Sequence, residues 1–322
     1  MWDTILLILG GLGLFLYAIT ALSDATQAVV GEKLEQWLRY FTRNLFWGIL
    51  TGTIVTAILG SSSAVIIITI VLVNANVFSF RQAIGIVLGA NVGTTISSQI
   101  VALDLGKISP IFIALGLILS IAIRNDWWKN LGKVILYFGF LFFGLLTMEQ
   151  AVEPLKKSEW FVNFLSNLDN LLVGTLAGMT TTLIIQSSSA TVGIAIVLVK
   201  KGMLSLKAGI SVMMGAELGT VSDTLLATIN GKRQAIKTGL FHFVFNLLSI
   251  VLGLVLFSPF VNLVEWISPT NQAEKILANA HLLFNLLGVV IFVWFVPLFE
   301  KLLNSILPDK ASSRKQESLA HH

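Results

Sequence analysis

The sequence contains no cysteine and few charged residues. The absence of cysteine excludes disulfides, thiol catalysis and cysteine metal sites. Only 12% of the 322 residues are charged, against about a quarter in a soluble domain, while 55% are hydrophobic. The mean hydropathy is +0.86. This composition is typical of a protein that lies in a lipid bilayer.

Motifs of several enzyme and binding classes are also missing. The sequence has no phosphate-binding loop of the GxxxxGK[ST] kind and no His/carboxylate metal pattern. A serine nucleophile would need a base, and neither His242 nor His281 can be placed beside the serines from sequence. The pI of about 9.3 could indicate nucleic acid, but basic cytoplasmic loops give a membrane protein the same value. We therefore expect no enzyme, no cofactor and no nucleic-acid partner.

The chain contains an internal duplication. A shift of 126 positions aligns Gly48–Ser98 with Gly174–Thr224 without a gap, with 20 identities in 51 pairs. The same shift pairs GANVGT at Gly89 with GAELGT at Gly215. Chance similarity of apolar segments would not keep one register over this length. We divide the chain into repeat one (1–125), repeat two (126–258), an extension with one transmembrane helix (259–307) and a polar tail (308–322).

Each repeat is predicted to be helical. Repeat one begins with a transmembrane helix near Thr4–Leu22, where Asp3 occupies a position that a signal peptide would make positive. The stretch GEKLEQWLRYFTR, from Gly31, is expected to lie in the membrane interface. Further helices are predicted near residues 110–123, 131–148, 236–257 and 280–299.

Two short apolar arms flank a serine triplet in each repeat. Leu45–Leu59 would be about 22 Å long as a helix, whereas a bilayer core is about 30 Å thick. The stretches LGSSSAVIIITIVLV and IQSSSATVGIAIVLV therefore predict re-entrant hairpins with the serines at their tips. A longer segment follows in each repeat, Gln82–Leu103 and Lys207–Ile229, and its glycines and threonines predict a broken transmembrane helix.

The layout predicts opposite orientations for the two repeats. Each repeat crosses the membrane an odd number of times if its hairpin does not cross, so the second copy must be upside down. Loops on one predicted side carry 14 of the 21 Lys and Arg residues, and the positive-inside rule assigns them to the cytoplasm. We therefore expect the N-terminus outside and the C-terminus inside. Inverted repeats with broken helices at mid-depth are typical of secondary transporters.

The serine triplets predict an oxyanion site. Opposed hairpins would bring Ser61–Ser63 and Ser187–Ser189 together near the membrane midplane. Each triplet lies where a second helical arm begins, so free amides and the helix dipole favour an anion there. Gln186 adds an amide donor, and Asn91 and Thr94 are further candidates. The alternative is that the serines bond back to their own helix or to a neighbour.

A cation site is predicted by two matching segments, GANVGTTISS from Gly89 and GAELGTVSDT from Gly215. Mid-segment glycines and hydroxyls indicate unwound backbone that could coordinate a cation, and ionisable groups at this depth are usually functional. The carboxylates could instead carry protons, or could be neutralised by buried partners. The candidate sodium ligands are Asn91, Thr94, Thr95, Glu217, Thr220 and Asp223. His242 and His281, each followed by Asn four residues on, predict interhelical hydrogen bonds.

These motifs resemble those of the type II sodium–phosphate cotransporters and their bacterial relatives. QSSSA at Gln186, GANVGTT at Gly89 and AHLLFN at Ala280 are similar to family segments. The resemblance implies sodium-coupled phosphate transport by alternating access, with the serine segments of both repeats binding phosphate. Gly60 stands where the family has glutamine. In the second repeat, GAELGTV at Gly215 departs from the family's GxNxGTT motif. A soluble PhoU-type domain, present in many bacterial members, is not expected here.

The sequence therefore predicts an all-α polytopic membrane protein with two inverted repeats. Its expected function is sodium-coupled symport of inorganic phosphate across a prokaryotic plasma membrane, with the lipid bilayer as surroundings and possible homo-oligomers. Alternatives are transport of another oxyanion or a carboxylate, proton coupling, or a membrane scaffold or sensor that binds phosphate without moving it.

Overall fold

The computed structural model describes the chain except residues 1, 31–35, 39, 41 and 309–322, and its described part is all-helical. The stretch expected in the membrane interface, 31–43, falls largely outside the described residues. The helices are α1 (Trp2–Val30), α3 (Leu45–Leu59), α4 (Ser62–Asn74), α5 (Phe80–Val101), α6 (Ser109–Ala122), α7 (Asp126–Val152), α8 (Glu159–Ser166), α9 (Leu171–Ile185), α10 (Ser188–Lys200), α11 (Leu206–Gly219), α12 (Val221–Leu226), α13 (Arg233–Val255), α14 (Phe257–Ile267), α15 (Ala273–Phe292) and α16 (Val296–Ile306).

Five helical segments in the described part are long and apolar enough to cross a bilayer. They are α1, α5, α7 with its 3-10 extension, α13, and α15 continued by α16. A sixth, made of α8 and α9, is bent by 106° at its break. The chain is thus a multi-pass membrane protein, and the predicted all-α class is confirmed. By contrast α3, α4 and α10 have only 15, 13 and 13 residues, fewer than the about 20 that a span needs.

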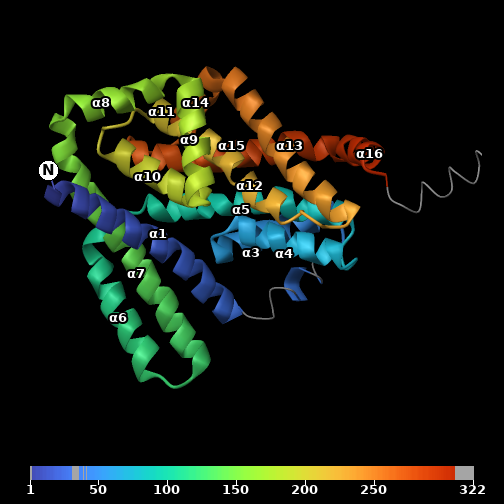
Figure 1. The fold of residues 1–322 in the computed structure, drawn as a ribbon, viewed down its shortest axis with the longest axis horizontal. Coiled ribbons are helices and arrows are strands. Elements are labelled where there is room, and N and C mark those ends of the chain that lie inside the picture. The colour runs from blue at the N-terminus through green and yellow to red at the C-terminus, as the bar shows by residue number, and fades with distance from the viewer. Residues whose placement is uncertain (1, 31–35, 39, 41, 309–322) are drawn as a thin grey trace, which may run out of the picture.

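The helices are arranged around α5, which lies beside α15 across the centre of the molecule (Figure 1). The α3 helix packs along α5 in repeat one, and α9 packs along α11 in repeat two. At the opposite end from α16, α6 and α7 form an antiparallel pair, and α1 lies against α7 (Figure 1).

Glycines at equivalent positions of the two repeats allow these close pairings. A Cβ added at Gly89 would lie 2.0 Å from the Ile49 carbonyl oxygen, and one at Gly215 would lie 1.8 Å from that of Thr175. The two glycines are 126 positions apart, so each repeat builds the same backbone-to-backbone contact. Small residues permit such approaches between membrane helices, where packing rather than hydrophobic burial drives association.

The predicted break in repeat one is wrong. The α5 helix runs unbroken from Phe80 to Val101. Its hydroxyls bond back to the preceding turn, as Thr94 does to the Ala90 carbonyl at 3.0 Å, so no backbone group is released to a cation. In repeat two the corresponding helix is divided into α11 and α12 at Thr220, whose own backbone angles stay helical.

Two boundaries also differ from expectation. The first helix extends to Val30, eight residues beyond the predicted Leu22, and these extra turns reach the site described next. The extension holds more helix than the single segment expected near 280–299, because α15 ends at Phe292 and α16 follows a short 3-10 turn.

Candidate functional site

The two serine triplets have the same local structure. Helix α3 ends at Gly60, whose φ of 68° is left-handed, and Ser61 then caps α4 by accepting a hydrogen bond from the Ala64 amide at 3.2 Å. Helix α9 ends at Gln186 with a φ of 58°, and Ser187 caps α10 through the Ala190 amide at 3.2 Å. A left-handed residue reverses the chain direction at each helix end. Glycine adopts the left-handed conformation without strain, whereas a residue with a side chain, such as Gln186, rarely adopts it.

Each triplet therefore presents the amino end of a helix. Ser62 and Ser63 form the first turn of α4, and Ser188 and Ser189 form that of α10. The amides of the first helical turn have no partner inside their helix, and the helix dipole adds partial positive charge. Each repeat therefore supplies one helix amino end that attracts anions.

Both helix ends open into one cavity of about 200 Å³. Its described lining consists almost entirely of hydroxyl, amide and carboxylate side chains, with a contribution from α1. The lining residues are Ile19, Thr20, Ser23, Asp24, Gln27, Gly60, Ser61, Ser62, Ser63, Ala64, Gln186, Ser187, Ser188, Ser189 and Thr220. The structure thus brings the two predicted triplets and Gln186 together around one space.

The third wall comes from α1 and was not predicted. Thr20, Ser23, Asp24 and Gln27 follow a spacing of three or four residues, so they share one helix face. The signal was present in the sequence TALSDATQ, a polar stripe at the end of an apolar helix. It was missed because the helix was expected to end at Leu22.

Of the predicted cation ligands, one lines the cavity and another contacts a residue that lines it. Thr220 lines it, and Asp223 accepts a hydrogen bond at 3.2 Å from the Ser63 hydroxyl of the opposite repeat. Ser222 also donates to Asp223, at 3.4 Å. The carboxylate of repeat two is therefore attached to the serine tip of repeat one.

The predicted ligands on α5 are not among the residues that line the cavity. Asn91 is 3% exposed and donates to the Val87 carbonyl at 2.8 Å. The hydroxyl of Thr95 donates to the Val92 carbonyl at 2.7 Å, and Thr94 bonds to its own helix as described above. These side chains have their hydrogen bonds inside α5.

Glu217 is likewise absent from the cavity lining and has a buried partner. Its carboxylate lies 2.9 Å from Nε2 of His281, and Nδ1 of that histidine lies 2.6 Å from the Ser98 hydroxyl. In a parallel arrangement, Nδ1 of His242 lies 2.8 Å from the Thr224 hydroxyl. Ser98 and Thr224 are equivalent in the two repeats. The predicted interhelical hydrogen bonds of both histidines are confirmed.

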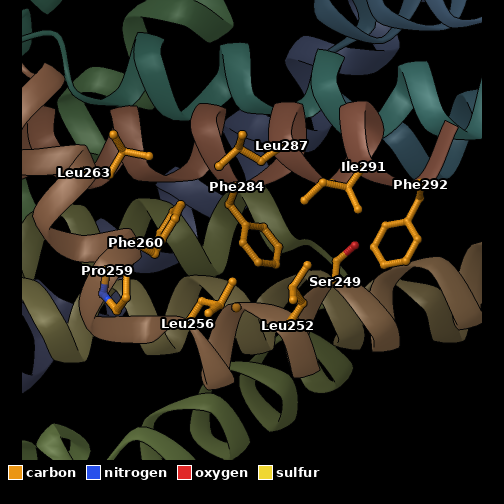
Figure 2. Close-up of a pocket in the computed structure, with 12 residues that line it drawn as sticks. Ser249, Leu252, Leu256, Pro259, Phe260, Leu263, Phe284, Leu287, Ile291 and Phe292 are labelled. Atoms are coloured by element: carbon orange, nitrogen blue, oxygen red, sulfur yellow. The ribbon is translucent and has the colours of Figure 1, made fainter. Parts of the chain in front are cut away.

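A second cavity has a different character. It measures about 180 Å³ and lies between α13, α14 and α15, lined by leucine, isoleucine and phenylalanine side chains with Ser249 as the hydroxyl among them (Figure 2). This groove offers almost no polar partner, so it cannot hold a small anion. Among the described residues, no group of three His, Cys, Asp or Glu side chains could hold a metal ion.

Comparison with known proteins supports a transport role for a protein built in this way. The family model described as Na+/Pi-cotransporter matches residues 14–150 and again 153–290. The uncharacterized protein YqeW of Bacillus subtilis (strain 168) is 31% identical over 297 residues, which is 92% of this chain and 96% of that protein. No solved structure matches the chain.

Two further relatives have descriptive names. The putative inorganic phosphate export protein YjbB of Escherichia coli (strain K12) is 25% identical over 95% of this chain, which spans 56% of the length of that relative. The human sodium-dependent phosphate transport protein 2B is 29% identical over 137 residues, 39% of this chain and 20% of that protein.

Proposed function

Because the chain belongs to the Na+/Pi-cotransporter family, which is a family of transporters, we propose that it moves inorganic phosphate across a membrane together with sodium. The observation that carries this proposal is that one serine triplet from each repeat lines the same cavity. A site shared between two repeats can be exposed to either side when one repeat moves against the other.

The cavity offers hydrogen-bond donors without a fixed positive charge. Serine hydroxyls, the first-turn amides of α4 and α10, and the amide of Gln186 can all donate to phosphate oxygens. No Lys, Arg or His is among the described residues that line it. A transporter has to release its substrate in every cycle, and neutral donors bind a phosphate anion less permanently than an arginine clamp would.

The proposed sodium site adjoins the phosphate site. Asp223 and Thr220 offer a carboxylate and a hydroxyl, and Asp223 already contacts Ser63 of the other repeat. A sodium ion at Asp223 would neutralise this carboxylate and draw the two tips together before phosphate arrives. Binding in this order couples the two solutes without any direct chemistry between them.

Alternating access requires an arrangement of the repeats that we propose as follows. The helix pairs α3–α4 and α9–α10 are re-entrant hairpins that enter from opposite membrane faces, within two repeats of inverted topology. This proposal is supported by the shortness of these helices and by the serines that end them in mid-structure. In a prokaryotic plasma membrane, the N-terminus would be outside and the C-terminus inside.

The buried pair of Glu217 and His281 supports a second candidate, proton-coupled transport. Their carboxylate and imidazole are 4% and 0% exposed and lie 2.9 Å apart, joined by one hydrogen bond. Transport of another oxyanion is a further alternative, as is phosphate binding without transport. The direction of flow is set by the gradients, and the name of the Escherichia coli relative describes export.

Phosphate uptake into proteoliposomes tests the proposal. We expect radiolabelled phosphate uptake that depends on an inward sodium gradient and falls at least about tenfold in Ser188→Ala, since a hydrogen bond to a charged group contributes about 1.5–3 kcal/mol. Ser166→Ala is the matched control, because Ser166 is exposed and bonds only to Asn163 nearby.

Each alternative gives a different result in the same assay. Uptake that follows a pH gradient without sodium would support proton coupling, and binding without counterflow would indicate a scaffold. Wild-type uptake in Ser188→Ala would contradict the assignment of the serine cavity.

A further inference from the structure

The cavity contains one charged side chain among its described lining residues, and that side chain is negative. Asp24 of α1 lines the same space as both serine triplets. Among the described residues it makes no hydrogen bond or ion pair. Its side chain is exposed and also lines a neighbouring pocket with Lys133 and Tyr137. An ionisable group on a membrane-spanning helix is usually functional. A carboxylate facing a site for an anion therefore needs an explanation.

The hydrogen-bonding capacities of the two walls differ. The serine tips supply hydroxyl and amide donors, whereas an ionised carboxylate can only accept. A ligand that contacts both walls must therefore have oxygens that accept and at least one hydrogen that it donates. Phosphate near neutral pH is such a ligand, because it carries one or two P–O–H groups. Sulfate has the same tetrahedral shape and carries no proton.

We propose that Asp24 is a specificity-determining residue that accepts a hydrogen bond from the P–O–H group of phosphate and rejects fully deprotonated oxyanions such as sulfate. This inference rests on the proposed function and assigns a role within the same cavity. Rejection has a direct physical cause, because sulfate would place a second negative charge against the carboxylate with no proton between them. Unpaired charge against the wrong ligand is a general means of discrimination.

The structure favours this role over direct binding of sodium by Asp24. The α1 helix is continuous from Trp2 to Val30, so its carbonyls are used within the helix and are not offered to a cation. The neighbouring Thr20 hydroxyl donates to the Leu16 carbonyl at 3.1 Å. The oxygens left to a cation on this wall are those of the Thr20, Ser23 and Gln27 side chains, whereas an acceptor for one P–O–H needs a single carboxylate oxygen.

Competition between anions tests the inference in proteoliposomes that hold the full-length protein. Labelled phosphate uptake is measured against increasing arsenate, which carries protons as phosphate does, and against sulfate. We expect arsenate to compete in the wild type and sulfate not to compete. In Asp24→Asn the neutral amide can donate to sulfate, so the sulfate concentration that halves uptake should fall at least about tenfold. Asp3→Asn is the matched control, since Asp3 is on the exposed first turn of the same helix.

The outcomes separate this inference from the proposed function. If the wild type neither takes up nor binds phosphate, the proposed function fails, and the inference with it. If the wild type is active and Asp24→Asn excludes sulfate as before, the inference alone is overturned. A change in sodium dependence without a change in the sulfate-to-arsenate ratio also overturns it and assigns Asp24 to the cation.

A second readout applies if Asp24→Asn folds but does not transport. Thermal stabilisation of the purified protein by phosphate, arsenate and sulfate reports binding without turnover. Stabilisation of Asp24→Asn by sulfate supports the inference, and stabilisation by phosphate alone contradicts it. Asp24→Ser provides a smaller neutral side chain for the same comparison if the Asn variant is poorly recovered.

Discussion

At the scale of single residues, most buried hydroxyls in the described chain have found partners. Many donate to the carbonyl of the preceding turn, as Thr69 does to Val65 at 2.8 Å. Among the described residues, the buried side-chain oxygens without a hydrogen-bond partner are those of Thr56 and Ser249. The Ser249 hydroxyl points into the apolar groove between α13, α14 and α15 (Figure 2). An unsatisfied buried hydroxyl is destabilising.

Replacing this hydroxyl should therefore stabilise the protein. We expect Ser249→Ala to raise the free energy of unfolding by about 1 kcal/mol, because it removes an unpaired polar group from an apolar site. Ser109→Ala should have the opposite effect, since that buried hydroxyl donates to the Gly106 carbonyl at 2.6 Å. Thermal unfolding of both variants in detergent measures the difference. A lower midpoint for Ser249→Ala would mean that its hydroxyl has a partner such as water or lipid.

At the scale of helices, pairs in close backbone contact support the cavity walls. The α9 helix, which ends at Gln186, packs on α11 through Gly178 and Gly215. The α3 helix, which ends at Gly60, packs on α5 through Gly52 and Gly89. Each serine tip is thus supported by an equivalent glycine-mediated helix contact. A substitution at the glycines of either contact should alter the cavity.

Gly215→Ala should disturb this support. The new Cβ would meet backbone atoms of Thr175 that cannot move aside, so we expect a loss of about 1–3 kcal/mol in stability and weaker phosphate uptake. Gly13→Ala is the control, because nothing lies within 4 Å of its added Cβ. In α1 that change should be neutral or slightly stabilising. Equal stability of the two variants in detergent would contradict the packing argument.

At the scale of the whole molecule, the central proposal is the opposite orientation of the two repeats. Equivalent loops follow α4 and α10, and Val77 and Met203 occupy matching positions in them, 126 residues apart. In an inverted duplication these two positions face opposite sides of the membrane. From the charge distribution and the positive-inside rule, we propose that the Val77 loop, beside Arg81, lies in the cytoplasm.

The absence of native cysteine allows a direct test. We expect Met203→Cys to react with a membrane-impermeant maleimide on intact cells, and Val77→Cys to react only after the cells are permeabilised. Labelling of purified protein controls for intrinsic reactivity of each thiol. Reaction of both positions from the same side would refute the inverted topology while leaving the serine cavity in place.

Local features of the fold could be predicted because they depend on neighbouring residues. The bounds of α3 at Leu45 and Leu59 follow from an Asn44 cap and a left-handed Gly60, and both are visible in the sequence. The unbroken course of α5 could not be predicted. In the sequence, Gly93 suggests a break in the helix. In the structure, its missing side chain allows α3 to pack closely, because an added Cβ would lie 2.5 Å from the Thr53 carbonyl oxygen.

The sequence by itself determined that the chain is a duplicated, helical membrane protein with a serine triplet at a helix start in each copy. Composition, repeat register and helix capping depend on neighbouring or regularly spaced residues, so they can be inferred from the sequence alone. Only the tertiary structure decided which polar groups share a space. It placed Asp24 and Asp223 at the serines and Glu217 on His281, because such pairings depend on how distant helices pack. Sequence spacing between separate helices holds no information about that packing.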